Sequence, residues 1–575
     1  MQQLECDVLV IGAGLSGVWA AARAKELAPR VILVDIAKVG KSGKSAFSGA
    51  GILCPDATDD LDVWHKEISE KGQYLADQDW VRLMLEEHPK RLKDMEDWGL
   101  TFERDANGKI HRHVGLNHVN TRITSVSSLE MLDVMRKRVE GIGVTLLERV
   151  MITGLLTSDG ATPSGGSVVG AVGLQTRTGE GFVINAGATV MASGSTGMFM
   201  GAGEGITQGF AAGADVRNME FSRCFDEMGF EDRYIGVHLN TYQRLGMKLV
   251  NAKGERFMEK YLPDLLERGR REDLGLAIVS EGLQGRAPIY MDLRHLDEDS
   301  MNKLHTMPTT RLIVNAMKEE GIDFRKRPIK YVVTSGPMYI RCGGMSTNIY
   351  GETTLPGLYA AGESSGFPAH GTYSVGGVNL ASCCVGGYRA GEYAAKYAAE
   401  NGCQPEVKSQ AQSLLRKQTG PLKAKSGLRP DDFFDEFHEY LSVAKISVFR
   451  SAQSIRELLQ NIKEWKTRIK TLKAEDPHEL VKANRVAPYL QCAELIFHSS
   501  LIREETRANN MRIDFPYKDN INWLKWIVQA SDGRGGIRTR KVPVPLYRYP
   551  VKPKEHTKIP VNLPIKMEAM EAKGV

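Results

Sequence analysis

The sequence lacks the cysteine pairs from which metal and cluster sites are usually built. Its eight cysteines are scattered, and no two of them form a C-x-x-C pair. Zinc ribbons and ferredoxin-type iron–sulfur clusters depend on such pairs, so neither is predicted, and we expect no bound metal. Scattered cysteines with apolar neighbours are typical of buried thiols in a reducing compartment rather than of a disulfide framework.

Long apolar segments and a strong charge of either sign are also missing. No run reaches the roughly 18 apolar residues that a membrane span needs, and the apolar N-terminal segment follows acidic rather than basic residues. The net charge is only +5, which makes nucleic acid a poor candidate for a partner. We therefore expect a cytoplasmic protein without a membrane span and without a nucleic-acid partner.

Glycine, by contrast, is in excess. The 58 glycines are about one residue in ten, against a typical ~7%. Glycine lets the backbone approach a ligand closely, although turns also use it. At 575 residues the chain is too long for one hydrophobic core, so we expect two or three domains.

A βαβ unit opens the chain. Residues 6–11 are a short apolar run typical of a buried parallel strand, and residues 18–27 are rich in alanine and predict a helix. Between them, GAGLSG at 12–17 fits the pattern G-x-G-x-x-G, and a second buried strand at 31–34 ends at Asp35. This order of strand, glycine turn, helix, strand and acid indicates a dinucleotide site.

Each position of the glycine pattern has a physical reason. Gly12 permits the tight turn, Gly14 lets the backbone approach a pyrophosphate, and Gly17 allows helix and strand to pack closely. The N-terminus of the helix faces the anion. Asp35 can accept hydrogen bonds from ribose hydroxyls, which favours FAD or NAD over NADP.

Glycine-rich segments recur far downstream and favour FAD over NAD. They include ASG at 192–194 and AAGE at 360–363, and the longer FAD needs such remote contacts. Three further motifs are KSGKSAFSGAG at 41–51, LPGLYAAGE at 355–363 and REETRANNMRIDFP at 503–516. In its motifs and their order the chain resembles the fumarate reductase, succinate dehydrogenase and L-aspartate oxidase flavoprotein family. The alpha subunit of adenylylsulfate reductase is a more distant relative.

The resemblance extends from near residue 5 to about residue 525. It implies an α/β protein with a Rossmann-like FAD-binding domain, an inserted α+β capping domain and a C-terminal helical domain. Together with changes in composition it predicts an FAD-binding domain at 1–219 and 336–404, a capping domain at 220–335, a helical domain at 405–535 and an extended Pro/Lys-rich tail at 536–575. Within the first domain, the charged segment from about residue 59 to 140 predicts helix.

The same resemblance implies which residues contact FAD. They lie in the glycine turn, at the ribose acid, in the loop that follows it and at the later glycine-rich strand ends: Gly12, Ala13, Gly14, Gly17, Asp35, Ser42, Lys44, Ser45, Gly49, Gly51, Ala192, Gly194, Glu363, Asn379 and Leu380. The alternative for Lys44 is a solvated loop lysine, and the alternative for Glu363 is a buried structural acid.

A covalent bond to the flavin is not expected. Succinate dehydrogenases, which the chain resembles, carry a flavin-linked histidine in the loop after the ribose acid. No histidine lies between residues 36 and 63 here, and Lys44 or a neighbour occupies that place. The resemblance therefore implies non-covalent FAD, as in L-aspartate oxidase and adenylylsulfate reductase.

The resemblance breaks at the substrate ligands. The family holds a dicarboxylate with two histidines and two arginines, but segments 219–227, 338–344 and 370–376 lack both of those histidines and one of the arginines. A charge-assisted hydrogen bond of this kind is worth about 1.5–3 kcal/mol. Fumarate and succinate are therefore not the expected substrates, and the tyrosines gained here point to a larger, less charged or thioester-like molecule.

Four residues are candidates for catalysis. Arg271 best matches the remaining family arginine, which delivers a proton, and the alternative is a surface arginine paired with the acids that follow it. His370 is retained from the family, which places it beside the flavin. Tyr373 and Tyr339 fall at former ligand positions, and Tyr373 either donates a proton or fills vacated space. Further polar candidates are His238, Tyr242 and Arg244.

A late segment carries charges of a different kind. Arg503, Glu505, Arg507 and Asp514 match a family segment near the end of the resemblance, and Asn510 stands where the family has histidine. We interpret this segment mainly as a structural ion network that docks the helical domain.

These observations predict an FAD-dependent oxidoreductase subunit. It exchanges hydride between non-covalent FAD and a small organic substrate such as an unsaturated acid or acyl thioester, and a separate iron–sulfur subunit takes up the electrons. Two alternatives stay open: an adenylylsulfate-reductase-like flavoprotein, and a non-catalytic electron-transfer or scaffold subunit of a redox complex.

Overall fold

The structure, a computed structural model of the full chain, places most residues between 1 and 561. The described residues are 1–48, 51–115, 118–197, 201–223, 227–231, 233–236, 239–269, 271–307, 310–334, 339–340, 342–373, 375–404, 407–444 and 448–561. No helix within these segments is long and apolar enough to cross a bilayer. The seven cysteines that fall within them are free thiols.

A seven-stranded sheet forms the centre of the N-terminal part. Hydrogen-bonded neighbours follow the order β5-β2-β1-β8-β7-β6, and β20 also pairs with β8. The strands are β1 (Gln2–Ile11), β2 (Val31–Asp35), β5 (Thr145–Glu148), β6 (Val150–Thr157), β7 (Val168–Gln175), β8 (Gly181–Met191) and β20 (Leu358–Ala360). Strands β5, β2, β1, β8 and β20 are parallel, so their carboxyl ends meet at one edge, where open α/β sheets bind ligands.

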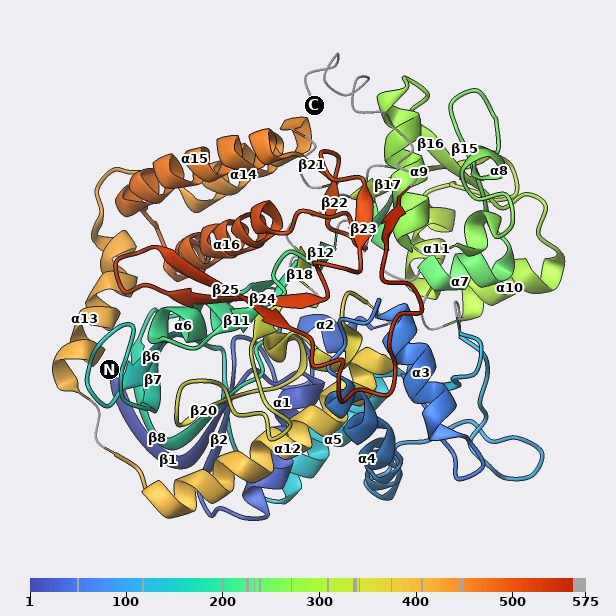
Figure 1. Cartoon of the computed structure of the whole chain (residues 1–575). Coiled ribbons are helices and arrows are strands. Elements are labelled where there is room, and N and C mark those ends of the chain that lie inside the picture. Colours follow the sequence, from blue (N-terminus) through green and yellow to red (C-terminus); the bar gives the residue numbers. More distant parts are fainter. Residues whose placement is uncertain are drawn as a thin grey trace.

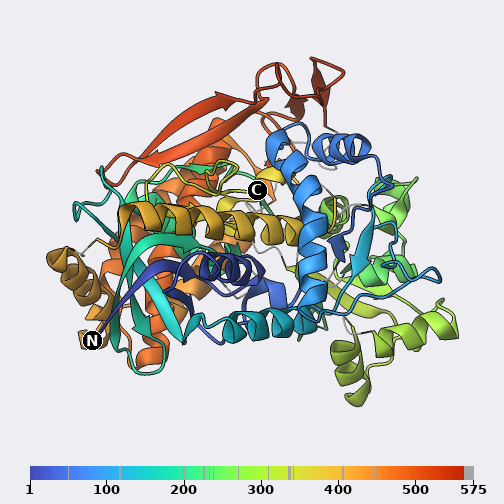
Figure 2. The same ribbon diagram turned by 90° about the horizontal axis from the view of Figure 1, so that it is seen from below.

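Two helices pack together against this sheet with very little space between them. A Cβ atom on Gly391 of α12 (Val378–Asn401) would lie 2.2 Å from the carbonyl oxygen of Ala20 in α1 (Leu15–Lys25). Small residues therefore join segments that are far apart in sequence, and Figure 2 shows α12 lying alongside the N-terminal segment. The remaining elements of this part are α2 (Gly43–Ala46), β3 (Gly51–Leu53), α3 (Leu61–Lys71), α4 (Gln78–Asp97), β4 (Ile123–Ser125), α5 (Ser128–Gly141), β9 (Thr196–Gly197), β10 (Gly201–Ala202) and α6 (Glu204–Ala212).

The inserted part has a sheet and a core of its own, drawn in green in Figure 1. Its sheet order is β14-β13-β17-β16-β15, and its core contains Phe230, Leu249 and Met291. The short pair of β12 (Ser222–Arg223) and β18 (Tyr339–Ile340) lies where the chain enters and leaves it. Its elements are β13 (Glu227–Phe230), β14 (Tyr234–Gly236), α7 (Leu239–Leu245), β15 (Lys248–Val250), α8 (Met258–Tyr261), α9 (Arg271–Leu283), β16 (Ile289–Asp292), α10 (Glu298–Thr306), α11 (Arg311–Glu319) and β17 (Ile329–Thr334).

Helices dominate the C-terminal part, drawn in orange and red in Figure 1. They are α13 (Lys408–Thr419), α14 (Pro430–Ala444), α15 (Ala452–Arg468) and α16 (Pro477–Ile502). The apolar faces of α14, α15 and α16 share one core with α6, in which Phe437, Trp465 and Leu490 belong to the same cluster as Phe210. Helix α13 packs instead on β6, β7 and β8 through Ala411. This shared core fixes the helices against the edge of the nucleotide sheet.

A hairpin follows the helices. Strands β24 (Lys525–Ser531) and β25 (Ile537–Pro543) pair along their whole length, and β24 also pairs with β11 (Val216–Arg217). The predicted boundary between residues 535 and 536 therefore falls in the turn of this hairpin. The remaining strands are β19 (Gly344–Met345), β21 (Phe449–Arg450), β22 (Met511–Arg512), β23 (Tyr517–Asp519) and β26 (Lys558–Pro560).

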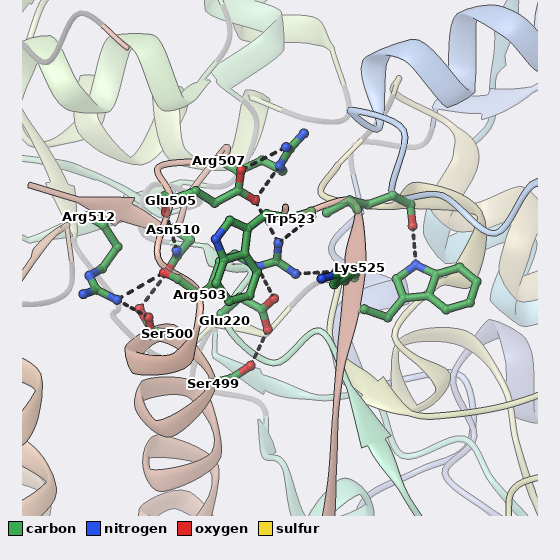
Figure 3. Close-up of polar contacts among 12 residues, drawn as sticks. Glu220, Ser499, Ser500, Arg503, Glu505, Arg507, Asn510, Arg512, Trp523 and Lys525 are labelled. Atoms are coloured by element: carbon green, nitrogen blue, oxygen red, sulfur yellow. Dashed lines mark hydrogen bonds and ion pairs between the residues drawn. The ribbon is translucent and has the colours of Figure 1, made fainter. Parts of the chain in front are cut away.

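A fully buried ion network connects the C-terminal part to the rest of the protein (Figure 3). Arg503 Nε donates to Glu220 at 2.7 Å, and Arg503 Nη1 donates to Glu505 at 2.8 Å. Arg507 donates twice to the same Glu505 carboxylate, at 2.7 and 2.9 Å. All four side chains are 0% exposed. With the further ion pair of Arg512 and Asp514 at 2.7 Å, these contacts confirm the ion network predicted from the sequence.

The predicted fold class is confirmed, with a Rossmann-like domain, an inserted α+β domain and helices at the C-terminal end. One local prediction was wrong. Residues 59–140 were expected to be helical, but the chain between α4 and α5 is a long irregular loop that contains β4. Charged residues at 103–113 resemble a solvated helix face, yet they belong to turns and isolated β-bridges.

Candidate functional site

A large cavity opens at the carboxyl ends of β1, β2 and β8. Its volume is about 1040 Å³, slightly above the ~300–1,000 Å³ typical of ligand sites. The lining residues come from the first 50 residues, from the loop before β4, from the ends of β8 and β20, and from the start of α12. A cavity of this size suits a long ligand that contacts distant segments of the chain.

The glycine turn after β1 shapes one end of the cavity. Gly12 has φ +97°, and a Cβ atom there would lie 2.5 Å from the carbonyl oxygen of Ala192. A Cβ atom on Gly17 would lie 1.8 Å from the carbonyl oxygen of Gly12. Gly14 is different, because a Cβ atom there would meet only Ser45 Oγ, at 3.4 Å. Gly12 and Gly17 are thus required by packing, whereas Gly14 leaves space on the cavity side.

The N-terminus of α1 lies directly after this turn. Its N-cap, Gly14, has no capping side-chain hydrogen bond, and the amide of Leu15 donates to Ser45 Oγ at 3.1 Å. The positive end of the helix dipole therefore points to a part of the cavity lined by Gly14 and Ser16. Backbone amides in this arrangement form an anion site that suits a pyrophosphate.

Asp35 holds the turn and the following loop together. One carboxylate oxygen accepts from the amide of Ala13 at 2.8 Å, and the other accepts from the amide of Ala37 at 2.8 Å and from Ser42 Oγ at 2.9 Å. Burial raises the pKa of Asp35, and these hydrogen bonds act in the opposite direction. A carboxylate offers about four acceptor positions, so Asp35 keeps capacity for a ribose hydroxyl on the cavity side.

Lys44 and Glu363 form an ion pair in the cavity wall. Lys44 Nζ donates to Glu363 Oε2 at 2.7 Å, to Ser195 Oγ at 2.9 Å and to the carbonyl oxygen of Thr196 at 2.7 Å. Their side chains are only 16% and 10% exposed. These contacts rule out the alternative of a solvated loop lysine, and Glu363 both pairs with Lys44 and lines the cavity.

The N-terminus of α12 forms another wall of the cavity. Its N-cap, Gly377, has φ +84° and no capping side-chain hydrogen bond, and a Cβ atom there would lie 2.7 Å from the amide nitrogen of Leu53. Gly376, Asn379 and Leu380 line the cavity. The N-termini of two long helices, α1 and α12, therefore face one cavity, which suits a ligand with negative charge at two places.

Most of the residues proposed for cofactor binding lie on this cavity. The lining ones are Gly12, Ala13, Gly14, Asp35, Ser42, Lys44, Ser45, Gly51, Ala192, Gly194, Glu363, Asn379 and Leu380. Gly17 packs behind the turn and does not line the cavity, while Gly49 lies outside the described residues. The role of Gly17 is therefore to hold α1 against the strand.

The four catalytic candidates are not placed equally. Tyr373 lines the cavity, but His370 is 0% exposed and lies behind it, with its ring stacked on Tyr373 at 5.3 Å between centroids. His370 Nε2 is also hydrogen-bonded to Asn379 Oδ1. His370 was expected beside the flavin; in the structure its side chain is buried and contacts Tyr373 and Asn379, which both line the cavity. The side chains of Arg271, at the start of α9, and Tyr339, in β18, lie outside the described part of the structure.

The inserted domain covers the far end of the cavity. Thr241 and Arg244 of α7 and Met307 after α10 contribute to its lining. Arg244 is exposed when the whole residue is considered. Its guanidinium group is nevertheless partly desolvated, which lowers the pKa of Arg244. Sequence reasoning named Arg244 only as a nearby polar residue and missed Thr241, Met307 and His118, because no motif marks them and their loops meet only in the folded chain.

Two family descriptions match the sequence. The family described as "FAD binding domain" matches residues 7–380, and the one described as "Fumarate reductase flavoprotein C-term" matches residues 439–558. The first covers the cavity wall described above and Glu220, and the second covers α15, α16 and the C-terminal members of the buried ion network.

Known proteins align over nearly the whole chain. A fumarate reductase (CoM/CoB) subunit of Methanothermobacter marburgensis is 30% identical over 541 residues, which are 89% of this chain and 95% of that protein. A single-site variant of the Escherichia coli quinol fumarate reductase has a TM-score of 0.85 at 23% identity, with 96% and 99% of the two chains covered. Adenylylsulfate reductase of Archaeoglobus fulgidus has a TM-score of 0.74 at 20% identity, with 94% and 96% covered. At these identities the two structures support the fold alone.

Proposed function

The chain belongs to the family of FAD-binding fumarate reductase and succinate dehydrogenase flavoproteins. We propose that this protein transfers hydride between non-covalent FAD and an organic substrate other than fumarate or succinate. The observation that carries the proposal is the contrast between the two ends of the cavity. The nucleotide end, lined by Gly12, Gly14 and Asp35, keeps the family motifs. The substrate end is the part covered by the inserted domain, and the sequence there lacks three of the four dicarboxylate ligands.

The residues of the nucleotide end fit FAD. Gly14 leaves the space that a pyrophosphate needs, and the α1 amides would hold its charge. Asp35 would accept from the ribose, and the N-terminus of α12 would lie against the flavin ring. When bound, FAD supplies the two-electron centre that accepts or donates hydride. The chain's own task is to orient the substrate and to supply the proton, for which Tyr373 and Arg271 are the proposed donors.

The substrate end supports a weakly charged substrate. Thr241, Arg244 and Met307 are the described lining residues of the inserted domain, and only Arg244 carries a charge. A dicarboxylate has two charges to balance, and each missing charge-assisted bond costs about 1.5–3 kcal/mol. An acyl thioester or a monocarboxylate fits these residues better.

We propose that a separate iron–sulfur subunit takes up the electrons. No cluster-forming C-x-x-C pair exists in the sequence, and the described residues contain no group of three or more potential metal ligands. Electrons that leave the flavin singly therefore need a centre on another chain. Co-purification of an iron–sulfur protein with the native flavoprotein would test this.

Titration of the FAD-loaded protein tests the substrate proposal. We expect crotonyl-CoA to perturb the flavin absorbance and fumarate to bind at least about 1000-fold more weakly, because the ligands for its two carboxylates are lost. Turnover of fumarate at ordinary enzyme rates would contradict the proposal. A response to adenylylsulfate alone would favour the adenylylsulfate-reductase-like alternative, and no response to any probe would favour a scaffold subunit.

Acid precipitation tests how the flavin is held. No histidine lies between residues 36 and 63, where the family forms its covalent link. We therefore expect all of the yellow chromophore in the supernatant after treatment with trichloroacetic acid, measured by its absorbance and by mass spectrometry as intact FAD. Flavin fluorescence that stays with the precipitated polypeptide would contradict non-covalent binding.

A further inference from the structure

The C-terminal helical part reaches the wall of the nucleotide cavity. Three residues of α16 line the cavity, namely His478, Val481 and Arg485. They are three and four positions apart in the sequence, so they lie on one face of the helix. A helix face, rather than one long side chain, therefore closes this part of the cavity.

This part of the cavity begins beside Asp35, the residue proposed for the ribose. Ala37 also lines the cavity, and its carbonyl oxygen accepts from the amide of Arg149 at 2.9 Å. That bond brings the start of β6 next to Ala37, and Val150 and Ile152 of this strand line the cavity as well. Since the pyrophosphate site at α1 lies on the other side of the ribose, the adenine of FAD would lie here.

Helix α6 connects β6 to α16. Gln208 Nε2 donates to the carbonyl oxygen of Ile152 at 2.9 Å. Glu204 lies one turn earlier in α6, and both of these α6 side chains line the cavity. The Glu204 carboxylate accepts from Arg485 Nε at 2.9 Å. A continuous series of contacts therefore leads from the ribose acid to Arg485.

The guanidinium of Arg485 keeps most of its donors for another group. Within the described segments its hydrogen-bond partner is Glu204 alone, and neither of its Nη atoms is buried. A guanidinium has five N–H donors, so the four on Nη1 and Nη2 remain available. Glu204 also accepts from the amide of Ala202 at 2.9 Å, which holds the ion pair in place. Arg485 thus presents fixed donors at the wall of the cavity.

We propose that Arg485 binds the adenine of FAD by donating from an Nη atom to a ring nitrogen, so that the C-terminal part supplies one wall of the cofactor site. This rests on the proposed function and adds a residue from a second domain to the nucleotide end. The ring nitrogens of adenine are acceptors, and a charged donor makes a stronger hydrogen bond than a neutral one. Binding of FAD and attachment of α16 are then linked, because the adenine contacts both parts.

Titration of the full-length protein, freed of FAD, tests the contact through flavin fluorescence. We expect Arg485→Met to raise the Kd for FAD by about 10- to 150-fold, because the adenine loses a charged donor. The Kd for FMN, which lacks the adenosine half, should stay within about twofold of the wild type. An unchanged Kd for FAD, or an equal loss for both flavins, would show that Arg485 does not act on the adenine.

A second cation of the same helix is the matched control. Lys482 of α16 pairs with Asp431 at 2.7 Å and does not line the cavity. Lys482→Met should leave the Kd values for FAD and FMN unchanged. A loss of FAD affinity as large as that of Arg485→Met would assign the effect to the helix as a whole and overturn the role of Arg485.

Hydrogen exchange of the wild type needs no variant and also decides the question if FMN does not bind. Saturating FAD should slow exchange at least about threefold in peptides from residues 477–490, because the bound adenine holds α16. Peptides from α15, which does not line the cavity, should not change. Equal rates in α16 with and without FAD would overturn the inference and leave the flavin function intact. A protein that takes up no FAD at all would contradict the proposed function itself.

Discussion

Gly17→Ala is expected to give a protein that binds FAD at least about 100-fold more weakly than the wild type and is less stable. The new methyl group would lie 1.8 Å from the carbonyl oxygen of Gly12, a backbone atom that cannot rotate away. Helix α1 must therefore shift from the strand, which costs about 1–3 kcal/mol and displaces the amides that hold the pyrophosphate. Flavin content after reconstitution and the thermal unfolding temperature measure the two effects.

Two other glycines serve as controls for this substitution. Gly14→Ala should fold normally, because its methyl group meets only Ser45 Oγ at 3.4 Å, yet it should bind FAD weakly since the methyl occupies the cradle. Gly386→Ala lies inside α12, where the nearest atom is 4.0 Å away, so neither property should fall. A yellow Gly17→Ala protein with normal affinity would show that α1 does not pack on the turn in this way.

The nucleotide end was predictable because its chemistry is local. Strand, glycine turn, helix and acid follow one another within residues 6–35, and each is specified by neighbouring residues. The fold places Gly12, Gly14 and Asp35 on one cavity for the same reason. The Lys44–Glu363 contact was not predictable from spacing, since its partners come from loops that only the sheet topology brings together.

The substrate end was predictable only in what it lacks. The missing histidines and arginine are visible in the sequence, but the residues that take their place are not adjacent to those motifs. His118 comes from an irregular loop that was expected to be helical, and Arg244 comes from the inserted domain. His370 was expected at the flavin because the resemblance placed it there, and its full burial against Tyr373 is seen only in the folded chain. Burial of this kind depends on tertiary packing and leaves no mark in the local pattern.

Glu220→Gln is expected to weaken the attachment of the C-terminal part, lowering the free energy of its local opening by about 3–5 kcal/mol. Glu220 is 0% exposed and accepts from Arg503 Nε at 2.7 Å and from Ser499 Oγ at 2.5 Å. Removing its charge leaves Arg503, Glu505 and Arg507 as a buried cluster with one uncompensated positive charge. Hydrogen exchange of peptides from the end of α16 and from β24 should report this loss as faster local opening.

An exposed ion pair provides the control. Lys93 and Asp97 of α4 are paired on the surface, with side chains 64% and 55% exposed. Lys93→Met should change stability by no more than about 0.5 kcal/mol, because water screens such a pair. An equal effect of Lys93→Met and Glu220→Gln would show that burial does not strengthen the network.

A double-mutant cycle then isolates the pair itself. Arg503 also donates to the carbonyl oxygens of Trp523, at 3.1 Å, and Lys525, at 2.7 Å, so Arg503→Met alone should cost at least as much as Glu220→Gln. If the two charges stabilise mainly each other, the double variant will lose less free energy of unfolding than the two single variants lose together. The difference should be about 1–3 kcal/mol. Strict additivity would mean that each residue acts through its other contacts. Because Glu220 lies two residues before β12, where the chain enters the inserted domain, a coupled pair would also tie the position of that domain to α16 and β24.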